Sequence, residues 1–322
     1  MQSLSVGIKE VKEAAKRITP YILSTPCLRN EWLSELAGTS VLVKWENLQQ
    51  TGSFKLRGAL NKMIQLKEQG VTQVMAISAG NHGLGIAYTA QLLGMHATIV
   101  VPAGAAENKV AAIRRYGVEL IIRGETYDEA ETLARDLAYQ RGIEFVSPYN
   151  DADVIAGQGT IVLEMLAQTP LDLLMVPVGG GGLLAGAAIA AKAADRDIEV
   201  IGVQAANSTA MYHSFRAGEL VKVSETPTYA DGLMGNIEDE CVTFPIIREL
   251  VSDILLANES AIERAIINYL KYDHLVVEGA SAVTAAVLME KRLSRPNMNI
   301  GLIVSGRNID LARLTALLQT YT

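Results

Sequence analysis

The sequence predicts an α/β fold with two open, parallel-sheet domains, each built in three layers. The chain has 322 residues, which is the length of roughly two domains of about 150 residues each. Short runs that are apolar throughout alternate along it with segments of helical periodicity. Strands that are apolar on both faces and separated by helices are typical of parallel sheets covered on both sides.

Eight apolar runs rich in β-branched residues are predicted as strands: 41–45, 73–77, 97–101, 118–122, 173–178, 199–204, 253–257 and 299–304. Nine segments of helical periodicity are predicted as helices: 54–67, 81–93, 109–116, 127–141, 154–167, 183–194, 259–271, 280–291 and 309–318. A further amphipathic helix is expected over residues 1–18. Its charges are spread throughout, so this segment lacks the apolar core of a signal peptide.

The order of these elements predicts how the domains are assembled. The strand–helix units from residue 73 to about residue 146 predict one sheet, and those from residue 173 onward predict a second, larger one. No linker rich in Pro, Gly or Ser divides the chain, so we expect one domain to be inserted into the other. The expected small domain is 66–148, and the expected large domain combines 1–65 with 149–322.

Composition excludes several classes of partner. Lys and Arg total 28 and Asp and Glu total 35, a formal charge of −7 without any basic run. We therefore expect neither nucleic acid nor a membrane surface as a partner. The longest apolar stretches, such as 179–191, are too short to span a bilayer. The only cysteines, Cys27 and Cys241, make no disulfide framework, and a cytoplasmic location is expected.

A glycine-rich turn predicts a phosphate site. An apolar strand runs into four consecutive glycines and then directly into an Ala-rich helix: Gly179, Gly180, Gly181 and Gly182, followed by Leu183. Their N–H groups are unobstructed and lie at a helix N-terminus, which favours an anion. The strand after this turn ends in Gln204, not in the acid that binds the ribose of a dinucleotide, and a Walker motif is absent. A ligand with a single phosphate group fits best.

Three more turns carry polar groups at strand ends. Lys55 lies in the first turn of a predicted helix, with Ser53 as the expected N-cap. A cation in the first turn opposes the helix dipole, which favours the neutral form of the lysine. The neutral amine is the form needed for Schiff-base chemistry. The turn at 78–83 offers N–H groups and the Asn81 amide, and the turn at 303–308 offers the Ser305 hydroxyl. Ligands of open α/β sheets bind at such carboxyl ends. A lysine, a monophosphate cradle, a carboxylate loop and a strand-end hydroxyl together indicate pyridoxal 5′-phosphate.

The same segments make the sequence resemble the fold type II pyridoxal-phosphate enzymes, the serine/threonine dehydratase and serine racemase family. The resemblance covers nearly the whole chain and rests on these motifs: T-G-S-F-K-x-R-G-A at 51–59, S-A-G-N-H at 78–82, V-I-A-G-Q-G-T at 154–160, G-G-G-G-L at 179–183, A-D-G at 230–232, E-G-A at 278–280 and S-G-x-N at 305–308. It implies a tryptophan synthase β-like fold. The length resembles the short catabolic threonine dehydratases, and we expect no C-terminal regulatory domain.

The resemblance also implies roles. Lys55 would form the Schiff base with the cofactor and act as the catalytic residue, Phe54 would pack on the cofactor, and Ser305 would bond the pyridine nitrogen. The other implied cofactor contacts are Asn81 to the ring hydroxyl, Gly179, Gly180, Gly181, Gly182 and Leu183 to the phosphate, and Gly232 as a cover. The implied substrate contacts are Ser78, Ala79, Gly80, Asn81 and His82. The larger domain would bind the cofactor and the smaller would close over the substrate; Tyr149 matches a position near the hinge.

The implied activity is that of a lyase, which eliminates water from L-threonine or L-serine to give a 2-oxo acid and ammonia. Ala79 replaces the serine that donates a proton in the resembling racemases, so serine racemisation is expected to be inefficient. Gln204 and Ala210 stand where those racemases hold a divalent cation, so no metal is expected. Arg307 departs from the common S-G-G-N pattern. It either faces solvent, pairs with an acid or contacts a substrate that bears an extra charge.

Several alternatives stay open at this point. Arg307 keeps dehydratases of other 3-hydroxy amino acids possible, including the hydroxyectoine-utilisation and 3-hydroxyaspartate types. A binding-only protein on this fold is disfavoured by Lys55, and a nicotinamide oxidoreductase is disfavoured by Gln204. Homodimers or homotetramers are common in the resembling family. The expected partner is a small-molecule amino acid substrate.

Overall fold

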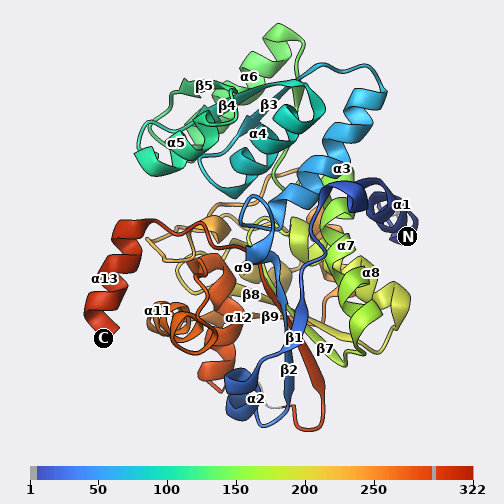
Figure 1. Ribbon diagram of the computed structural model, residues 1–322, viewed down its shortest axis with the longest axis vertical. Helices are drawn as coiled ribbons and strands as arrows, with labels where there is room; N and C mark the ends of the chain where they lie inside the picture. Colours follow the sequence, from blue (N-terminus) through green and yellow to red (C-terminus); the bar gives the residue numbers. More distant parts are fainter. Residues whose placement is uncertain (1–5, 292–294, 322) are drawn as a thin grey trace.

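The computed structural model describes residues 6–291 and 295–321, and the chain forms two sheets that lie one above the other in Figure 1. The larger sheet has the strand order β1-β2-β10-β7-β8-β9 and the smaller has β5-β4-β3-β6. All neighbouring strands pair in parallel except β1, which runs antiparallel to β2 at one edge. The predicted α/β class with two open sheets is confirmed, and the antiparallel edge strand makes the larger sheet mixed.

The strands of the larger sheet are β1 (Cys27–Arg29), β2 (Ser40–Trp45), β7 (Leu173–Pro177), β8 (Glu199–Ala205), β9 (Asp253–Ala257) and β10 (Asn299–Val304). Those of the smaller sheet are β3 (Gln73–Ile77), β4 (His96–Val101), β5 (Glu119–Ile122) and β6 (Glu144–Phe145). All eight predicted strands are present, with ends that differ by at most one residue. The two that prediction missed, β1 and β6, are three and two residues long.

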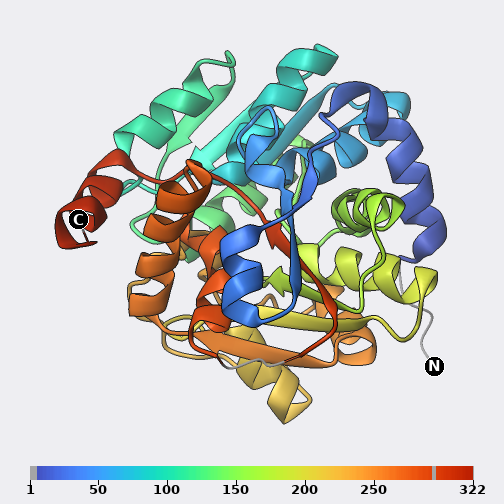
Figure 2. The ribbon, with the colours of Figure 1, turned by 60° about the horizontal axis from the view of Figure 1, so that its bottom comes forward.

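The helices cover both faces of each sheet (Figures 1 and 2). On the larger sheet, one face packs on α1 (Ile8–Ile18), α7 (Ala152–Gln168), α8 (Gly182–Ala194) and α10 (Thr243–Leu250). The other face packs on α2 (Glu31–Ala37), α11 (Glu259–Asn268), α12 (Gly279–Met289) and α13 (Leu311–Tyr321). The smaller sheet lies between α3 (Lys55–Glu68), α4 (Asn81–Leu93) and α5 (Glu107–Arg114) on one side and α6 (Tyr127–Arg141) on the other. Each sheet is therefore the middle of three layers.

Local sequence explains several helix ends. The carboxylate of Asp151 accepts hydrogen bonds from the backbone N–H groups of Asp153 and Val154 and so caps α7. The predicted helix over 259–271 instead passes from α11 into a π-helical turn, Tyr269–Asp273. Prediction also missed α2, α10 and the short helix α9 (Ala210–Ala217). The expected helix 1–18 is present as α1; residues 1–5 lie outside the described residues.

Two further features bear on function. Within the described ranges, no helix is both long and apolar enough to cross a bilayer. Cys27 and Cys241 are both free thiols, as expected. The division of the chain at residues 66 and 148 stays a prediction; α3, which crosses the first of these boundaries, packs against α4 beside the smaller sheet and against α7 beside the larger one.

Candidate active site

Three of the four predicted turns meet directly between the two sheets. The backbone N–H of Phe54 donates to the carbonyl of Ser305 over 2.9 Å, and the strand-like bridge between Ser53 and Gly306 joins the same two turns. The side chain of Asn308, at the end of the β10 turn, donates to Asn81 Oδ1 over 2.6 Å. The lysine turn, the carboxylate loop and the serine turn therefore form one connected surface.

The glycine turn joins this surface through residues 148 and 149. Lys55 Nζ donates to the carbonyl oxygen of Pro148 over 2.8 Å. The next residue, Tyr149, lies directly against the turn, since a Cβ placed on Gly180 would be only 2.6 Å from its ring. The Tyr149 hydroxyl accepts a hydrogen bond from the backbone N–H of Glu238, which fixes the ring. Lys55 is thus held one residue away from the side chain that packs on the phosphate cradle.

Burial prepares Lys55 for chemistry at its nitrogen. Burial of the ammonium lowers the pKa of Lys55 to about 8, while the nearby carboxyl of Glu278 acts in the opposite direction. About one tenth of the amine is therefore neutral at pH 7, far more than at its ordinary pKa of 10.5. A neutral amine is the form that attacks an aldehyde carbon and later accepts a proton.

The glycine turn presents unused hydrogen-bond donors. Among the described residues, the backbone N–H groups of 179–183 have no acceptor, although Gly181, Gly182 and Leu183 are buried. Gly181 has a φ of +96°, which a residue with a side chain rarely adopts, and it is the N-cap of α8. Buried N–H groups are almost always satisfied, and here they point from a positive helix end. This arrangement fits a dianionic phosphate group.

The end of β10 fixes the hydroxyl of Ser305. Ser305 is buried, and its Oγ lies 3.0 Å from Ser281 Oγ at the start of α12. Beside it, the buried hydroxyls of Thr51 and Ser53 have no partner within the described part of the chain. Ser53 is not the side-chain N-cap that prediction expected, because α3 begins at Lys55 and its N-cap residue is Phe54. Phe54 itself is partly buried beside Lys55, whose nitrogen lies 5.3 Å from the ring centroid.

The turn after β3 exposes part of its first four residues, 78–81, and buries the side chain of His82. Ser78, Ala79, Gly80 and Asn81 are partly exposed, and the N–H of Gly80 donates to Ser78 Oγ over 3.0 Å. His82 instead turns inward, with Nε2 donating to the carbonyl of Val146 over 2.9 Å. Burial, with a smaller effect from the charge of Lys55, lowers the pKa of His82 to about 3. The ring of His82 is therefore neutral and structural, which leaves its backbone N–H as the group that can face a carboxylate.

Glu278 is a residue of the site to which the sequence assigned no role. Its Oε1 accepts from the Asn81 amide over 2.7 Å and its Oε2 accepts from the Asn308 N–H over 3.0 Å. Burial, followed by the nearby charge of Asp231, raises the pKa of Glu278 to about 7. Glu278 opens the motif E-G-A, but neither the spacing nor the composition of this motif indicates which amides its carboxylate meets.

The segment around Gly232 closes one side of the site. Gly232 lies in the short helix Asp231–Leu233, and a Cβ built on it would be 4.0 Å from Glu278 Oε1. Asp231 forms an ion pair with Lys109 of α5 over 2.9 Å, and with Arg313 of α13 over 3.3 Å. The ion pair between Asp231 and Lys109 ties α5, in the helical layer of the smaller sheet, to the segment around Gly232.

Arg307, whose role the sequence left open, lies at the rim. Its side chain is exposed and has no hydrogen-bond or ion-pair partner among residues 6–291 and 295–321, while its N–H donates to the carbonyl of Gly52. Gln204 Oε1 accepts from the N–H of Tyr212. Across the same described ranges, no cluster of three or more His, Cys, Asp or Glu side chains could hold a metal ion.

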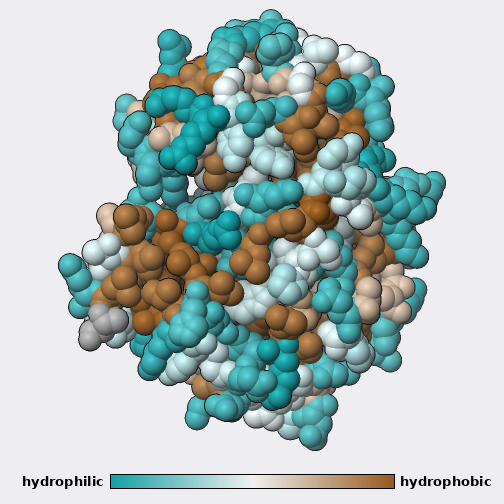
Figure 3. Space-filling view, viewed as in Figure 1, coloured by the Kyte–Doolittle hydropathy of each residue, from teal (hydrophilic) through white to brown (hydrophobic). Residues whose placement is uncertain are grey.

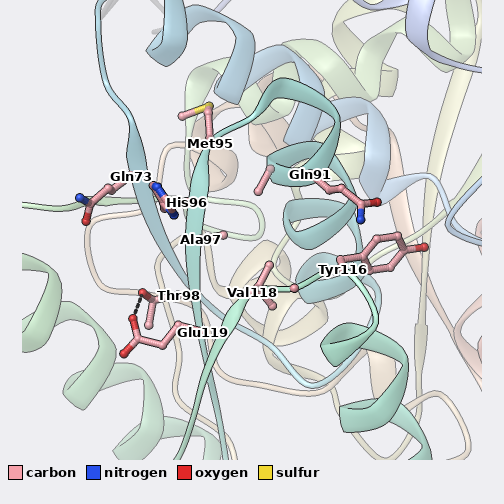
Figure 4. Close-up of a pocket in the computed structure, with 11 residues that line it drawn as sticks. Gln73, Gln91, Met95, His96, Ala97, Thr98, Tyr116, Val118 and Glu119 are labelled. Atoms are coloured by element: carbon pink, nitrogen blue, oxygen red, sulfur yellow. Dashed lines mark hydrogen bonds between the residues drawn. The ribbon is translucent and has the colours of Figure 1, made fainter.

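A cavity lies outside this site. A cavity of about 410 Å³ is lined by the amino ends of β4 and β5 and by residues of α4, including His96, Glu119 and Gln91 (Figure 4). In Figure 4 the Glu119 carboxylate points toward Thr98, which donates to it over 2.8 Å. Because the candidate site lies at the opposite, carboxyl ends of the strands, this cavity is not part of it.

Comparison with known proteins decides the family. The model of the pyridoxal-phosphate dependent enzymes matches residues 18–306. The chain belongs to this family. Pyridoxal 5′-phosphate is therefore its cofactor, and the free N–H groups of the glycine turn, the Lys55 amine and the Ser305 hydroxyl fit its phosphate, aldehyde and ring nitrogen.

Individual relatives in the pyridoxal-phosphate family are similar over nearly the whole chain. The L-threonine ammonia-lyase of Thermotoga maritima is 39% identical, over 95% of this chain and 76% of its own length. The catabolic L-threonine dehydratase of Escherichia coli K12 is 38% identical, over 97% of this chain and 96% of its own. The crystal structure of the serine racemase of Dictyostelium discoideum matches with a TM-score of 0.88 at 36% identity, over 95% and 99% of the two chains. The expected fold type II architecture is confirmed.

Proposed function

We propose that this enzyme is an ammonia-lyase that removes water from L-threonine or L-serine and releases a 2-oxo acid and ammonia. The observation that carries the proposal is the position of Lys55, a partly buried amine with its pKa lowered to about 8, tied through residues 148 and 149 to a turn of free N–H groups. The similarity to threonine ammonia-lyase and threonine dehydratase supports this reaction.

Each residue then has a definable task. The N–H groups of 179–183 would hold the phosphate and Asn81 would bond the ring hydroxyl. Phe54 would pack on the ring and Gly232 would cover it. The backbone of the 78–82 turn holds the substrate carboxylate, with Ser78, Ala79 and Gly80 lining it. When bound, the cofactor supplies an electron sink for the charge that develops at the substrate Cα. Lys55 Nζ, in its neutral form, would accept the Cα proton of the bound substrate.

Departure of the β-hydroxyl is favoured by the group that faces the ring nitrogen. Ser305 bears a hydroxyl, which cannot transfer a full proton to a pyridine as a carboxylic acid can. The electron sink is therefore weaker, and prompt loss of the leaving group is favoured over transfer of the amino group. Closure of the proposed small domain 66–148 on the proposed large domain, 1–65 with 149–322, would exclude water from the reacting carbon.

Serine racemisation is the less favoured outcome on this site. Ala79, which lines the carboxylate turn, has no proton to deliver to the second face of Cα. The Dictyostelium relative is named a serine racemase, so the point needs a direct assay. Rapid formation of D-serine from L-serine by the purified enzyme would contradict this assignment.

A second candidate substrate class is favoured by Arg307. Its exposed guanidinium, without a partner in the described ranges, lies beside the 51–53 turn that leads to Lys55. A 3-hydroxy amino acid with an additional acidic group would pair with it. Arg307→Gly would then raise the KM for the acidic substrate and leave that for threonine unchanged.

The test of the proposed function is a substrate panel assayed by release of ammonia and of 2-oxo acid. Threonine and serine are expected to be turned over, and Lys55→Ala is expected to abolish turnover. Lys67→Ala is the matched control, because Lys67 lies in the same helix with an exposed side chain. Full activity in Lys55→Ala, or loss of activity in Lys67→Ala alone, would contradict the proposal.

We also propose that the enzyme is cytoplasmic and forms a homodimer or homotetramer. Free thiols suit a reducing compartment. Figure 3 shows an apolar area over α11 and α13, where Leu311 is 71% exposed, and such areas often mark contacts between subunits. Light scattering after size-exclusion chromatography measures the assembly directly, and a monomeric mass would contradict the oligomer.

A further inference from the structure

Thr243, the first residue of α10, binds a carbonyl group of the glycine turn. Its side chain is fully buried, and its hydroxyl donates to the carbonyl oxygen of Gly180 over 2.7 Å. Within the described ranges, no backbone N–H donates to this carbonyl. The four glycines have no polar side chains of their own, so Thr243 supplies a contact that the turn cannot make by itself.

The hydrogen bond to Gly180 also fixes the direction of the next N–H group. The carbonyl of Gly180 and the N–H of Gly181 belong to one planar trans peptide, so they point in opposite directions. Since the carbonyl points at Thr243, the N–H of Gly181 points away from α10. Gly181 is buried, and its N–H has no acceptor among the described residues. This N–H is one of the donors that the proposed phosphate would use.

The backbone alone does not hold this peptide in one orientation. Turning it over requires opposite rotations of about 180° in the ψ of Gly180 and the φ of Gly181. The φ of Gly181 would change from +96° to about −84°, which lies in a widely allowed region. Glycine on both sides of the peptide makes either state sterically accessible. The turned peptide would aim the Gly180 carbonyl oxygen along the present N–H direction, where it would repel a phosphate dianion.

The Thr243 hydroxyl favours the orientation that the structure shows. This hydroxyl has one hydrogen to donate. The other acceptor that it meets in the described part of the chain is Cys241 Sγ at 3.6 Å, and a thiol sulfur accepts weakly. Even if the turned N–H donated to the Thr243 oxygen, the hydroxyl hydrogen would keep only this sulfur. A buried donor without a good acceptor is unfavourable, so Thr243 stabilises the unturned peptide.

The start of α10 is itself held by the segment 149–150, which also packs on the glycine turn. The side-chain oxygen of Asn150 accepts from the N–H of Val242 over 2.8 Å. A Cβ placed on Gly181 would lie only 3.0 Å from the Cβ of Thr243. Thr243 therefore cannot move away from the turn without breaking these contacts.

We propose that Thr243 is a positioning residue that locks the peptide between Gly180 and Gly181, so that the N–H of Gly181 is directed at the cofactor phosphate. The inference rests on the proposed function, which places the phosphate at residues 179–183. Thr243 contacts the turn and not the phosphate. Loss of its hydroxyl would therefore weaken binding of the phosphate group and leave binding of the rest of the cofactor intact.

The experiment uses two ligands, pyridoxal 5′-phosphate and pyridoxal, which differ in the phosphate group. The full-length apoprotein is titrated with each, and the dissociation constants are measured by fluorescence. Thr243→Val removes the hydroxyl at nearly constant volume, and Thr243→Ser retains the hydroxyl. Thr284→Val is the matched control, because Thr284 is buried in α12 and its hydroxyl has no partner among the described residues.

In Thr243→Val we expect the dissociation constant of pyridoxal 5′-phosphate to rise about tenfold, the scale of one hydrogen bond to a charged group. The dissociation constant of pyridoxal should stay at the wild-type value. Thr243→Ser and Thr284→Val should match the wild type with both ligands. The comparison of ligands separates the lock from general damage to the site, since general damage would weaken the binding of both.

Three results would overturn the inference. They are wild-type affinity for pyridoxal 5′-phosphate in Thr243→Val, an equal loss of affinity for both ligands in that variant, and the same selective loss in Thr243→Ser or Thr284→Val. If Thr243→Val does not fold, Thr243→Ala, which also removes the hydroxyl, must show the selective loss. A wild-type enzyme that binds pyridoxal 5′-phosphate but releases no ammonia would instead contradict the proposed function and leave the comparison of ligands valid.

Discussion

Glu278 accepts a hydrogen bond of 2.7 Å from the amide of Asn81 and thereby joins the start of α12 to the start of α4. One residue belongs to the helical layer of the larger sheet and the other to that of the smaller sheet. The relationship makes the ionisation of one buried carboxyl relevant both to the site and to the contact between the layers.

Glu278 predicts a pH dependence of stability. Its pKa is about 7 in the folded chain and near 4.5 when unfolded, so the folded state binds more protons between these values. The free energy of unfolding contributed by this group therefore falls as the pH rises from 4.5 to about 7. Glu278→Gln should remove this fall. Urea unfolding of the apoprotein at about pH 5 and about pH 7.5 tests it, and an identical fall in the variant would contradict the prediction.

The lowered pKa of His82 predicts the opposite dependence of stability on pH. The folded pKa of about 3 lies below the unfolded value of 6.5, so the unfolded state binds more protons between them. The contribution of His82 to stability is complete above 6.5 and is lost as the pH falls toward 3. His82→Gln, which stays neutral, should lose less stability on acidification than the wild type does. Equal acid sensitivity of the two proteins would show that His82 is not the group responsible.

We expect truncation of the Arg57 side chain to cause a large loss of stability. Its guanidinium is fully buried and donates to Glu46 over 2.8 Å and to Glu164 over 2.6 Å. Removing one member of a buried pair leaves an uncompensated charge, so Arg57→Ala should lower the free energy of unfolding by about 3–5 kcal/mol. Arg29→Ala is the control, because its pair with Glu31 is exposed and should contribute less than about 1 kcal/mol. Denaturant titration distinguishes the two, and similar losses would refute the argument.

Gly181 predicts a specific loss of cofactor affinity. Its φ of +96° is unfavourable for alanine, and a Cβ there would lie 2.7 Å from the side chain of Ile247. Gly181→Ala should therefore displace the donors of the turn and raise the dissociation constant of pyridoxal phosphate about tenfold or more. Gly104→Ala, where a Cβ meets no atom within 4 Å, should leave it unchanged. Fluorescence titration measures both, and wild-type affinity in Gly181→Ala would exclude the turn as the phosphate site.

Regular periodicity explains why so much of the fold could be predicted. The bounds of β3, β9 and β10 agree with the structure, since each is one polar residue followed by an unbroken apolar run that ends at the next polar residue. The strand β1 was missed because it is three residues long and two of them, Leu28 and Arg29, are exposed, so it carries no apolar pattern.

The site was less predictable than the fold because long-range contacts leave no local signal. Lys55 and the glycine turn stand out by residue type and position. The partners of Glu278 and Ser281 come from the start of α4 and from the turn after β10, far away in sequence, and nothing near 278 or 281 indicates them. Ser53 was expected to cap α3 from its residue type, but its backbone pairs with Gly306 and its hydroxyl stays unpartnered in the described part of the chain.

The central claim is that the Lys55 amine bonds covalently to the cofactor aldehyde. Borohydride reduction of the yellow holoenzyme, followed by peptide mass spectrometry, tests it directly. We expect the reduced phosphopyridoxyl group on Lys55 and loss of the visible absorption, with Lys55→Ala unlabelled. A label on another lysine, or none on a protein that retains bound pyridoxal phosphate, would contradict the account.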